Sequence, residues 1–221
     1  MALVRLADLM DQPAAGGFLR GVVAGGRFAN AYLLHGPAGV GKGTAALAFA
    51  RALLCERGAG ARPAVRGDLF AAAQPAPAGP PLDDACGECN ACRKTGDLQH
   101  PDLKFLFPVS GEERELDNVI IETVAAVREN PLFVFAYEKA ASIRLSVTRE
   151  LLRELSFQPF EAPRRVVVVR DADRKREDQY SALLKSIEEP GTTVWVLTSS
   201  RVNRLPATIR SRCQRVRFAP L

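Results

Sequence analysis

The segment from Gly36 to Thr44, GPAGVGKGT, has the spacing of a phosphate-binding loop. It follows the apolar run Tyr32 to Leu34 and leads into an Ala- and Leu-rich stretch, as expected for a strand, a glycine-rich turn and a helix. Glycines allow backbone N–H groups to converge on phosphate oxygens, and Lys42 would neutralise the outer phosphates. The candidate nucleotide-binding residues of this segment are Gly36, Gly39, Gly41, Lys42, Gly43 and Thr44.

Gly43 breaks the pattern at a position that matters for chemistry. In the motif Gly-x-x-x-x-Gly-Lys-[Ser/Thr], the last residue supplies a hydroxyl to Mg²⁺. Gly43 has no side chain, and Thr44 would point about 100° further round the helix. The sequence therefore predicts a loop that can hold phosphates but is poorly equipped to hydrolyse them. It leaves open whether ATP and Mg²⁺ are cofactors.

A cluster of thiols forms the second group with chemical potential. Cys86, Cys89 and Cys92 have the spacing Cys-x-x-Cys-x-x-Cys, and Cys55, at the end of the helix after the phosphate loop, is the natural fourth ligand. Four thiolates suit a tetrahedral structural Zn²⁺, with an iron–sulfur cluster or free thiols as the alternatives. A closed site of this kind would hold the surrounding loop in place. Cys213 lies far away in the sequence and is predicted to be a core residue.

Composition limits the compartment and the partners. The chain of 221 residues carries a net charge of +5, and its basic residues crowd the last third, from Arg164 to Arg217. This distribution suits contact with nucleic acid, and equally a solvated basic surface. The chain has no run of about eighteen apolar residues and no signal-like opening segment, which argues against a membrane span and secretion. Five cysteines without a secretion signal favour a reducing, cytoplasmic location.

Apolar runs and helical periodicities alternate along the chain, which indicates an α/β fold. Val166 to Val169 are four consecutive valines, typical of a strand covered on both faces of a parallel sheet. The expected strands are 32–34, 103–107, 166–169, 193–198 and 215–218. The expected helices are 6–25, 41–55, 119–129, 146–156, 178–188 and 205–212. In such sheets the ligand lies at the carboxyl ends of the strands.

Two stretches lie outside this alternation. Residues 56–100 hold a Pro/Ala-rich loop followed by the cysteine module. Residues 108–142 are predicted to be an insertion that packs against the main domain, and the sequence does not indicate its function.

Seven motifs follow one another: NAYLLHGPAGVGKGT, the cysteine cluster, HPDL, RELLRELSFQP, VVVVRDAD, SALLKSIEEPGTTVWVLTSS and LPATIRSRCQRVRF. Together they resemble the AAA+ ATPase module of bacterial DNA polymerase III clamp-loader subunits, the delta-prime type above all. The resemblance implies an AAA+ P-loop NTPase domain over residues 1–221, a parallel sheet flanked by helices with a small zinc-binding module inserted. Family members continue into a helical lid and a collar domain, so both are expected to be absent from this chain, which ends at Leu221.

The two residues that directly follow the strand ending at Val169 distinguish the delta-prime type from the gamma/tau motor subunits. The motors have Asp-Glu there, for Mg²⁺ and for the attacking water, whereas this chain has Arg170 and Asp171. If Asp171 instead holds the metal, Ala172 takes the position of the base, so one catalytic part is missing either way. The resemblance thus implies an ATPase-impaired stator without intrinsic ATPase activity. The alternative is a gamma/tau-like active motor in which Thr44 and Asp171 fill the vacancies.

The resemblance also implies a role in a neighbouring subunit's site. Arg212, in the triplet Ser211-Arg212-Cys213, matches an arginine finger that acts on ATP in trans, although a surface arginine is the plainer interpretation. Thr198 matches a polar sensor of the γ-phosphate, although threonine commonly ends strands. The implied partners are gamma/tau and delta subunits and, through the complex, the sliding clamp and primer–template DNA. A P-loop nucleoside or nucleotide kinase with the cysteines as a lid is a further alternative, but it gives LLKSIEEP and the triplet no role.

Overall fold

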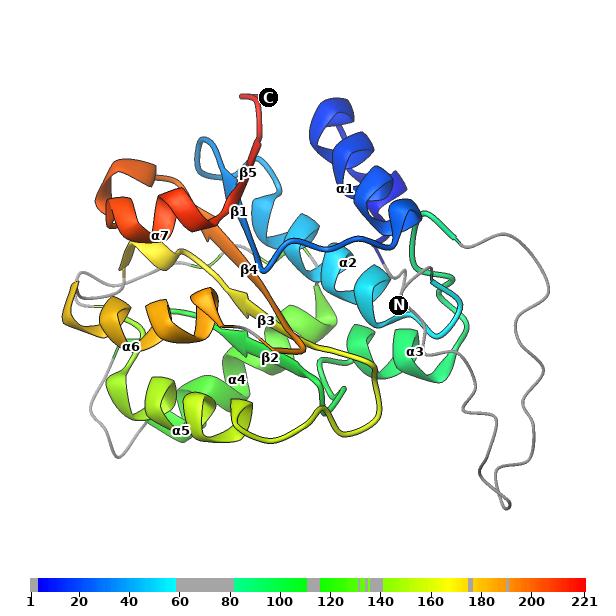
Figure 1. Cartoon of the computed structure of the whole chain (residues 1–221). Coiled ribbons are helices and arrows are strands. Elements are labelled where there is room, and N and C mark those ends of the chain that lie inside the picture. Colours follow the sequence, from blue (N-terminus) through cyan, green and yellow to red (C-terminus); the bar gives the residue numbers. More distant parts are fainter. Residues whose placement is uncertain are drawn as a thin grey trace, which may run out of the picture.

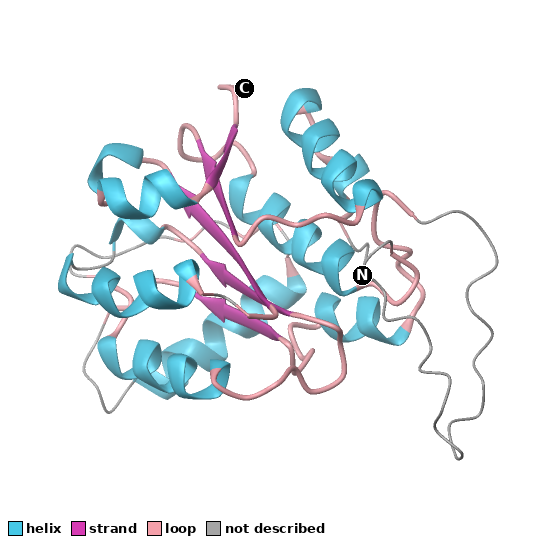
Figure 2. Ribbon diagram, in the orientation of Figure 1, coloured by secondary structure: helices cyan, strands magenta, loops and turns pink. Residues whose placement is uncertain are grey.

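A five-stranded parallel sheet forms the centre of the computed structural model (Figures 1 and 2). The structure describes residues 4–58, 82–110, 116–130, 132–133, 135, 141–174, 177–189 and 191–221. The strand order is β2-β3-β4-β1-β5. The strands are β1 (Ala31–His35), β2 (Leu103–Leu106), β3 (Arg165–Val169), β4 (Thr193–Ser199) and β5 (Gln214–Arg217). The predicted parallel α/β architecture is confirmed.

Helices cover the sheet on both faces (Figure 1). The helices are α1 (Pro13–Gly25), α2 (Lys42–Leu54), α3 (Asn90–Gly96), α4 (Leu116–Glu129), α5 (Leu145–Leu155), α6 (Glu177–Glu188) and α7 (Ala207–Arg212). Short 3₁₀ turns occupy Leu6–Asp8, Ala172–Arg174 and Val202–Arg204. Among the described residues, no helix has the length and apolar character needed to span a bilayer.

Alternate residues of the central strands face opposite apolar layers. Val166 and Val168 of β3 pack with residues of α1 and α2, whereas Val167 and Val169 pack with residues of α5, α6 and α7. All four valines are 0% exposed, so the prediction of a strand covered on both faces is confirmed. Because both faces of the sheet are sealed, the open ends of the strands are the places where its backbone can meet a ligand.

The single helix predicted over residues 6–25 is wrong. The structure has a 3₁₀ turn at Leu6–Asp8, and α1 begins only at Pro13. Proline lacks the backbone N–H that a helix interior needs but fits the first helical position. The expected helices include none around the cysteines, whereas α3 begins directly after Cys89, whose Sγ accepts the N–H of Cys92 as an N-cap.

The insertion predicted over residues 108–142 begins and ends with a backbone bridge. Val109 and Ser142 exchange N–H···O hydrogen bonds of 3.1 and 3.0 Å, which bring the two ends of the segment together. Between them, Leu116 of α4 packs with Phe107 and Val109 in a small apolar cluster that Phe135 also contacts. Parts of both unusual stretches, residues 59–81, 111–115, 131, 134 and 136–140, lie outside the described residues. The boundaries of these two segments stay predictions.

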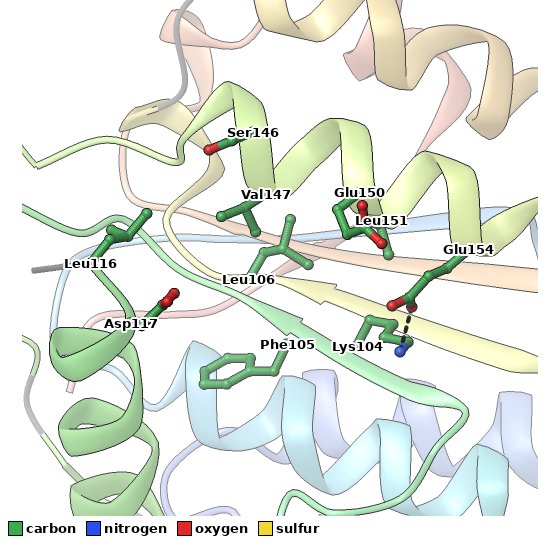
Figure 3. A pocket seen from close by; sticks show the side chains of 10 residues that line it. All are labelled: Lys104, Phe105, Leu106, Leu116, Asp117, Ser146, Val147, Glu150, Leu151 and Glu154. Atoms are coloured by element: carbon green, nitrogen blue, oxygen red, sulfur yellow. Dashed lines mark ion pairs between the residues drawn. The ribbon is translucent and has the colours of Figure 1, made fainter. Parts of the chain in front are cut away.

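A groove with a volume of about 580 Å³ lies between β2, α4 and α5 (Figure 3). Its floor is apolar, with Leu106 and Leu151, and one end is closed by an ion pair of 2.5 Å between Lys104 Nζ and Glu154 Oε2. None of the site residues predicted from the sequence lines this groove. The candidate site lies instead at the carboxyl ends of β1, β3 and β4.

Candidate phosphate-binding and metal sites

The glycine-rich loop connects the end of β1 at His35 to the start of α2 at Lys42. Gly39 and Gly41 both have a φ of 84°, in the left-handed region that favours glycine. At Gly36 a Cβ would lie 2.4 Å from the carbonyl oxygen of Phe218, so only glycine fits beside the end of β5. The loop therefore has the backbone conformation that its sequence predicted.

Lys42 lies inside this loop, with 6% of its surface exposed. Its Nζ donates a hydrogen bond to the carbonyl oxygen of Pro37, in the same loop. Burial lowers the pKa of Lys42, while the nearby carboxylates of Asp171 and Asp173 oppose this shift and Arg170 adds to it. The ammonium is thus surrounded by the loop at the position where a phosphate-binding lysine is needed.

The side chain of Arg170 lies against Gly43. A Cβ placed on Gly43 would be 2.3 Å from Nη1 and 2.8 Å from Cζ of Arg170. In P-loop NTPases, a hydroxyl at the position of Gly43 and a carboxylate at the position of Arg170 hold Mg²⁺. These positions carry a hydrogen atom and a guanidinium here, so the residues present do not fit a magnesium ion. Thr44, the third residue of α2, is half-buried.

Thr198 and Asp171 meet at the ends of β4 and β3. The backbone N–H of Asp171 donates to Thr198 Oγ1 at 2.9 Å, and Thr198 is 1% exposed. Asp171 has a φ of 44°, a left-handed conformation that costs an L-residue other than glycine about 1 kcal/mol or more. The hydroxyl predicted as a sensor therefore also holds a strained turn directly beside Arg170.

Asp173 is a further site residue, which the sequence interpretation did not single out. Its buried carboxylate accepts hydrogen bonds from Ser199 Oγ at 2.9 Å, from Arg201 Nε at 2.9 Å and from the N–H of Ser200 at 3.3 Å. These bonds join the turn after β3 to the end of β4. In the sequence, Asp173 is the second acidic residue of VVVVRDAD. It could have been predicted as a site residue, because a buried polar group at this edge of the sheet needs hydrogen-bond partners.

Arg212 lies on α7, in the same layer as α6 (Figure 1). Its Nε is 2.7 Å from Glu188 Oε1, and its Nη1 donates to Thr208 O at 2.9 Å and Ser211 Oγ at 3.4 Å. The side chain is 40% exposed. Its polar contacts within the described chain are with α7 and α6, not with the glycine-rich loop.

The four cysteines converge as their spacing predicted. The Sγ atoms of Cys55, Cys86, Cys89 and Cys92 all lie within 4.8 Å of one another. The Cys55–Cys89 and Cys86–Cys92 sulfur distances are 4.0 and 3.8 Å. A tetrahedral zinc with Zn–S bonds of about 2.3 Å requires S···S distances of about 3.8 Å. The donor set and its geometry therefore fit a metal ion. Cys213 is buried in the core, away from this cluster.

Backbone and carboxylate contacts orient the cysteine cluster. The N–H groups of Cys86 and Cys89 donate to the sulfurs of Cys55 and Cys86 at 3.5 and 3.3 Å. Hydrogen bonds from Cys55 and Cys92 hold the pKa of Cys89 below its usual range, and the bond to Cys89 raises the pKa of Cys55 to about 11. Nearby, the buried carboxylate of Asp84 accepts the N–H groups of residues 6 and 7 at 3.2 and 2.9 Å. The module is thus tied to the N-terminal segment as well as to α2.

A parallel sheet whose first strand leads into a lysine-bearing glycine loop is the architecture of the P-loop NTPase fold. The model of the family described as DNA polymerase III, delta subunit, matches residues 70–221. The chain is also 34% identical over 192 residues to the DNA polymerase III subunit delta' of Pseudomonas aeruginosa, covering 86% of this chain and 43% of that protein. It therefore belongs to this DNA polymerase III subunit family and is of the delta-prime type.

Other similarities are more distant. The DNA polymerase III subunit tau of Bacillus subtilis is 24% identical over 215 residues, covering 97% of this chain and 29% of that protein. The Thermotoga maritima RuvB Holliday junction branch migration motor has the same fold, with a TM-score of 0.50 at 13% identity, over 98% of this chain and 47% of that one. The predicted AAA+ fold and family are thereby confirmed. The chain spans less than half the length of these relatives.

Proposed function

We propose that this chain is an ATPase-impaired stator subunit of a DNA polymerase III clamp loader, which supplies Arg212 to the ATP site of a neighbouring subunit. The observation that carries the proposal is the guanidinium of Arg170 against Gly43. Phosphoryl transfer depends on positioning and electrostatic stabilisation, so the loss of the metal-binding hydroxyl and carboxylate lowers the rate by several orders of magnitude. The loop glycines and Lys42, which can hold phosphates, are retained. The site would therefore bind a nucleotide without hydrolysing it.

The active gamma/tau-like motor remains the competing function. It would require Thr44 and Asp171 to replace the missing groups. The Asp171 carboxylate lies 3.6 Å from Arg170 Nε, so it already faces a cation that belongs to the chain. The Arg170 contact therefore favours the stator over the motor.

Arg212 is the proposed catalytic group in trans. A planar guanidinium can bridge β- and γ-phosphate oxygens and stabilise the charge that develops during transfer. Its exposure on α7, and its lack of contact with this chain's own loop, support a role on a neighbour. The proposed partners are gamma/tau and delta subunits, with the sliding clamp and primer–template DNA reached through the assembled complex.

The cysteine cluster is proposed to hold a structural Zn²⁺ through Cys55, Cys86, Cys89 and Cys92. All four positions around the ion would be filled by thiolates, which leaves none for a substrate. The bound ion would join the carboxyl end of α2 to α3 and so fix both ends of the Pro/Ala-rich segment.

The test is ATP hydrolysis by the reconstituted clamp loader on primed DNA. Arg212→Ala should lower turnover at the site it completes by about 10³-fold or more, as for other arginine fingers. Arg204→Ala is the matched control, because Arg204 is also exposed and lies before α7. Full ATPase activity in the Arg212→Ala complex would contradict the stator role. Hydrolysis by the isolated subunit that is lost in Lys42→Ala would support the motor instead.

A further inference from the structure

We propose that Arg170 is a built-in counter-cation of the phosphate site, so that the loop binds a nucleoside di- or triphosphate without a divalent metal ion. The inference deepens the proposed function and rests on it, because it concerns the glycine-rich loop of a subunit proposed not to hydrolyse ATP. It is independent of Arg212.

The position of Arg170 is fixed by the sheet. It is the first residue after β3, and its N–H donates to Leu106 O at 2.8 Å, which continues the hydrogen bonding between β2 and β3. Its side chain extends from there to the second residue of α2, Gly43. The guanidinium therefore lies beside the first turn of the helix that follows the phosphate loop, where N–H groups attract anions.

Phe135 holds the guanidinium from another side. The Cζ atom of Arg170 lies 3.9 Å from the centroid of the Phe135 ring, a cation–π contact. Phe135 is itself held by the rings of Phe105 in β2 and of Phe107 just after this strand, with centroid distances of 6.4 and 5.5 Å. Asp171 Oδ2 lies 3.6 Å from Nε. The insertion thus acquires a role, because it brings an aromatic platform to the phosphate site.

Gly43 and Arg170 form a matched pair. Any side chain at position 43 would overlap the guanidinium, since its Cβ would lie 2.3 Å from Nη1. A P-loop serine or threonine and this arginine are therefore mutually exclusive in the observed conformation. The absence of a side chain at Gly43 is the condition that lets a cation of the chain occupy this place.

The chemistry of a guanidinium matches phosphate but not hydrolysis. Its planar fork can form two parallel hydrogen bonds to phosphate oxygens, and it stays charged at all physiological pH values. Together with Lys42 it offers two positive charges to a polyphosphate. Unlike Mg²⁺, a guanidinium does not coordinate several oxygen atoms around one centre. It therefore cannot hold the phosphates in the geometry that phosphoryl transfer requires. Binding without turnover is the expected outcome.

The test is a calorimetric titration of the purified protein with ATP and with ADP, in EDTA and in excess MgCl₂. We expect binding to be at least as tight in EDTA as in excess MgCl₂, because no ion takes part and Mg²⁺ in solution occupies the phosphate oxygens that Arg170 and Lys42 would contact. Arg170→Gln should weaken binding at least about tenfold, as for the loss of a charged hydrogen-bonding group. Lys42→Ala should abolish it, and Arg204→Gln, an exposed arginine outside the site, should leave it unchanged.

A second variant keeps the test informative if Arg170→Gln disturbs the fold. The double variant Gly43→Ser/Arg170→Asp restores the two groups that hold Mg²⁺ in P-loop NTPases, and its nucleotide binding should become magnesium-dependent. Magnesium-dependent binding by the unaltered protein would overturn the inference. So would no binding in either buffer, or equal binding by a folded Arg170→Gln variant. The last two of these results leave the Arg212 experiment, and hence the stator role, unaffected.

Discussion

Arg212 forms an ion pair with Glu188, in which Nε lies 2.7 Å from Oε1. The two side chains belong to α7 and α6, and they are 40% and 44% exposed. A pair this accessible to water contributes at most about 1 kcal/mol. The proposed arginine finger is therefore held against α6 of its own chain by a weak ion pair. Contacts with the phosphates of a nucleotide on a neighbouring subunit could replace this pair.

Replacing Glu188 should release Arg212 at little cost. We expect Glu188→Gln to change the free energy of unfolding by less than about 1 kcal/mol, measured by urea denaturation, because the pair is largely solvated. The ATPase rate of the reconstituted complex should stay within about twofold of that with the unaltered chain, since the finger keeps its charge and its helix.

Glu189→Gln, an exposed neighbour on the same segment, is the control. A loss of ATPase as large as that of Arg212→Ala, seen for Glu188→Gln alone, would show instead that Glu188 must hold the arginine in its working position.

Gly43→Ala should stabilise the protein by less than the ~0.5–1 kcal/mol that replacing a helical glycine would otherwise give, because the flexible end of the Arg170 side chain must move aside. The added methyl group would meet the guanidinium of Arg170, 2.3 Å from Nη1. This shortfall should disappear in the background of Arg170→Ala, so a double-mutant cycle by urea denaturation should give a coupling free energy of about 0.5 kcal/mol or more.

Gly17→Ala is the matched control for this cycle. Gly17 also lies in a helix, and a Cβ there meets nothing within 4 Å. The substitution should stabilise the protein by about 0.5–1 kcal/mol through helix propensity. Equal effects of the two glycine substitutions would contradict the contact with Arg170.

Metal removal should loosen the cysteine module. We expect the purified protein to contain close to one zinc per chain by elemental analysis, and Cys89→Ser to lose it, because the sulfur geometry fits a tetrahedral ion. The unfolding temperature should fall by several degrees or more, since metal binding free energy contributes to folding. Cys213→Ala removes a thiol outside the cluster and should keep the zinc. Zinc retained by Cys89→Ser would exclude that ligand.

The protein should lose stability as the pH falls below about 6.5, the ordinary pKa of histidine. His100 is buried, its Nδ1 accepts the N–H of Asp102 at 3.1 Å, and burial lowers its pKa, although nearby Glu161 opposes the shift. A lowered folded-state pKa means that the unfolded chain binds the proton more tightly, so the stabilisation present at neutral pH is lost on acidification.

The measurement is the free energy of unfolding between pH 7.5 and about 5.5, the interval in which an unfolded histidine takes up its proton. His35, whose pKa burial also lowers, contributes to the same slope. His100→Asn keeps a hydrogen-bond acceptor and should flatten the slope in part. An unchanged slope in this variant would show that His100 does not carry the effect.

Local patterns determined most of the fold. The valine run of β3, the glycines before Lys42 and the spacing of Cys86, Cys89 and Cys92 each depend on near neighbours in the chain, so the sequence alone predicted the elements, the loop and the thiol cluster. The departure at Gly43 was likewise visible. Helix starts were less certain, as Pro13 and α3 show, because they depend on backbone hydrogen bonds that the residue types only partly specify.

Only the tertiary structure decided how distant groups meet. The packing of α2 across β3 and β4 places the end of β3 beside the start of α2, and this lets Arg170 reach Gly43. The packing of the insertion on β2 adds Phe135 to the same place, and the layer shared by α6 and α7 pairs Glu188 with Arg212. These contacts join segments that are far apart in the chain, and their geometry follows from the packing of whole elements rather than from any local pattern of residues.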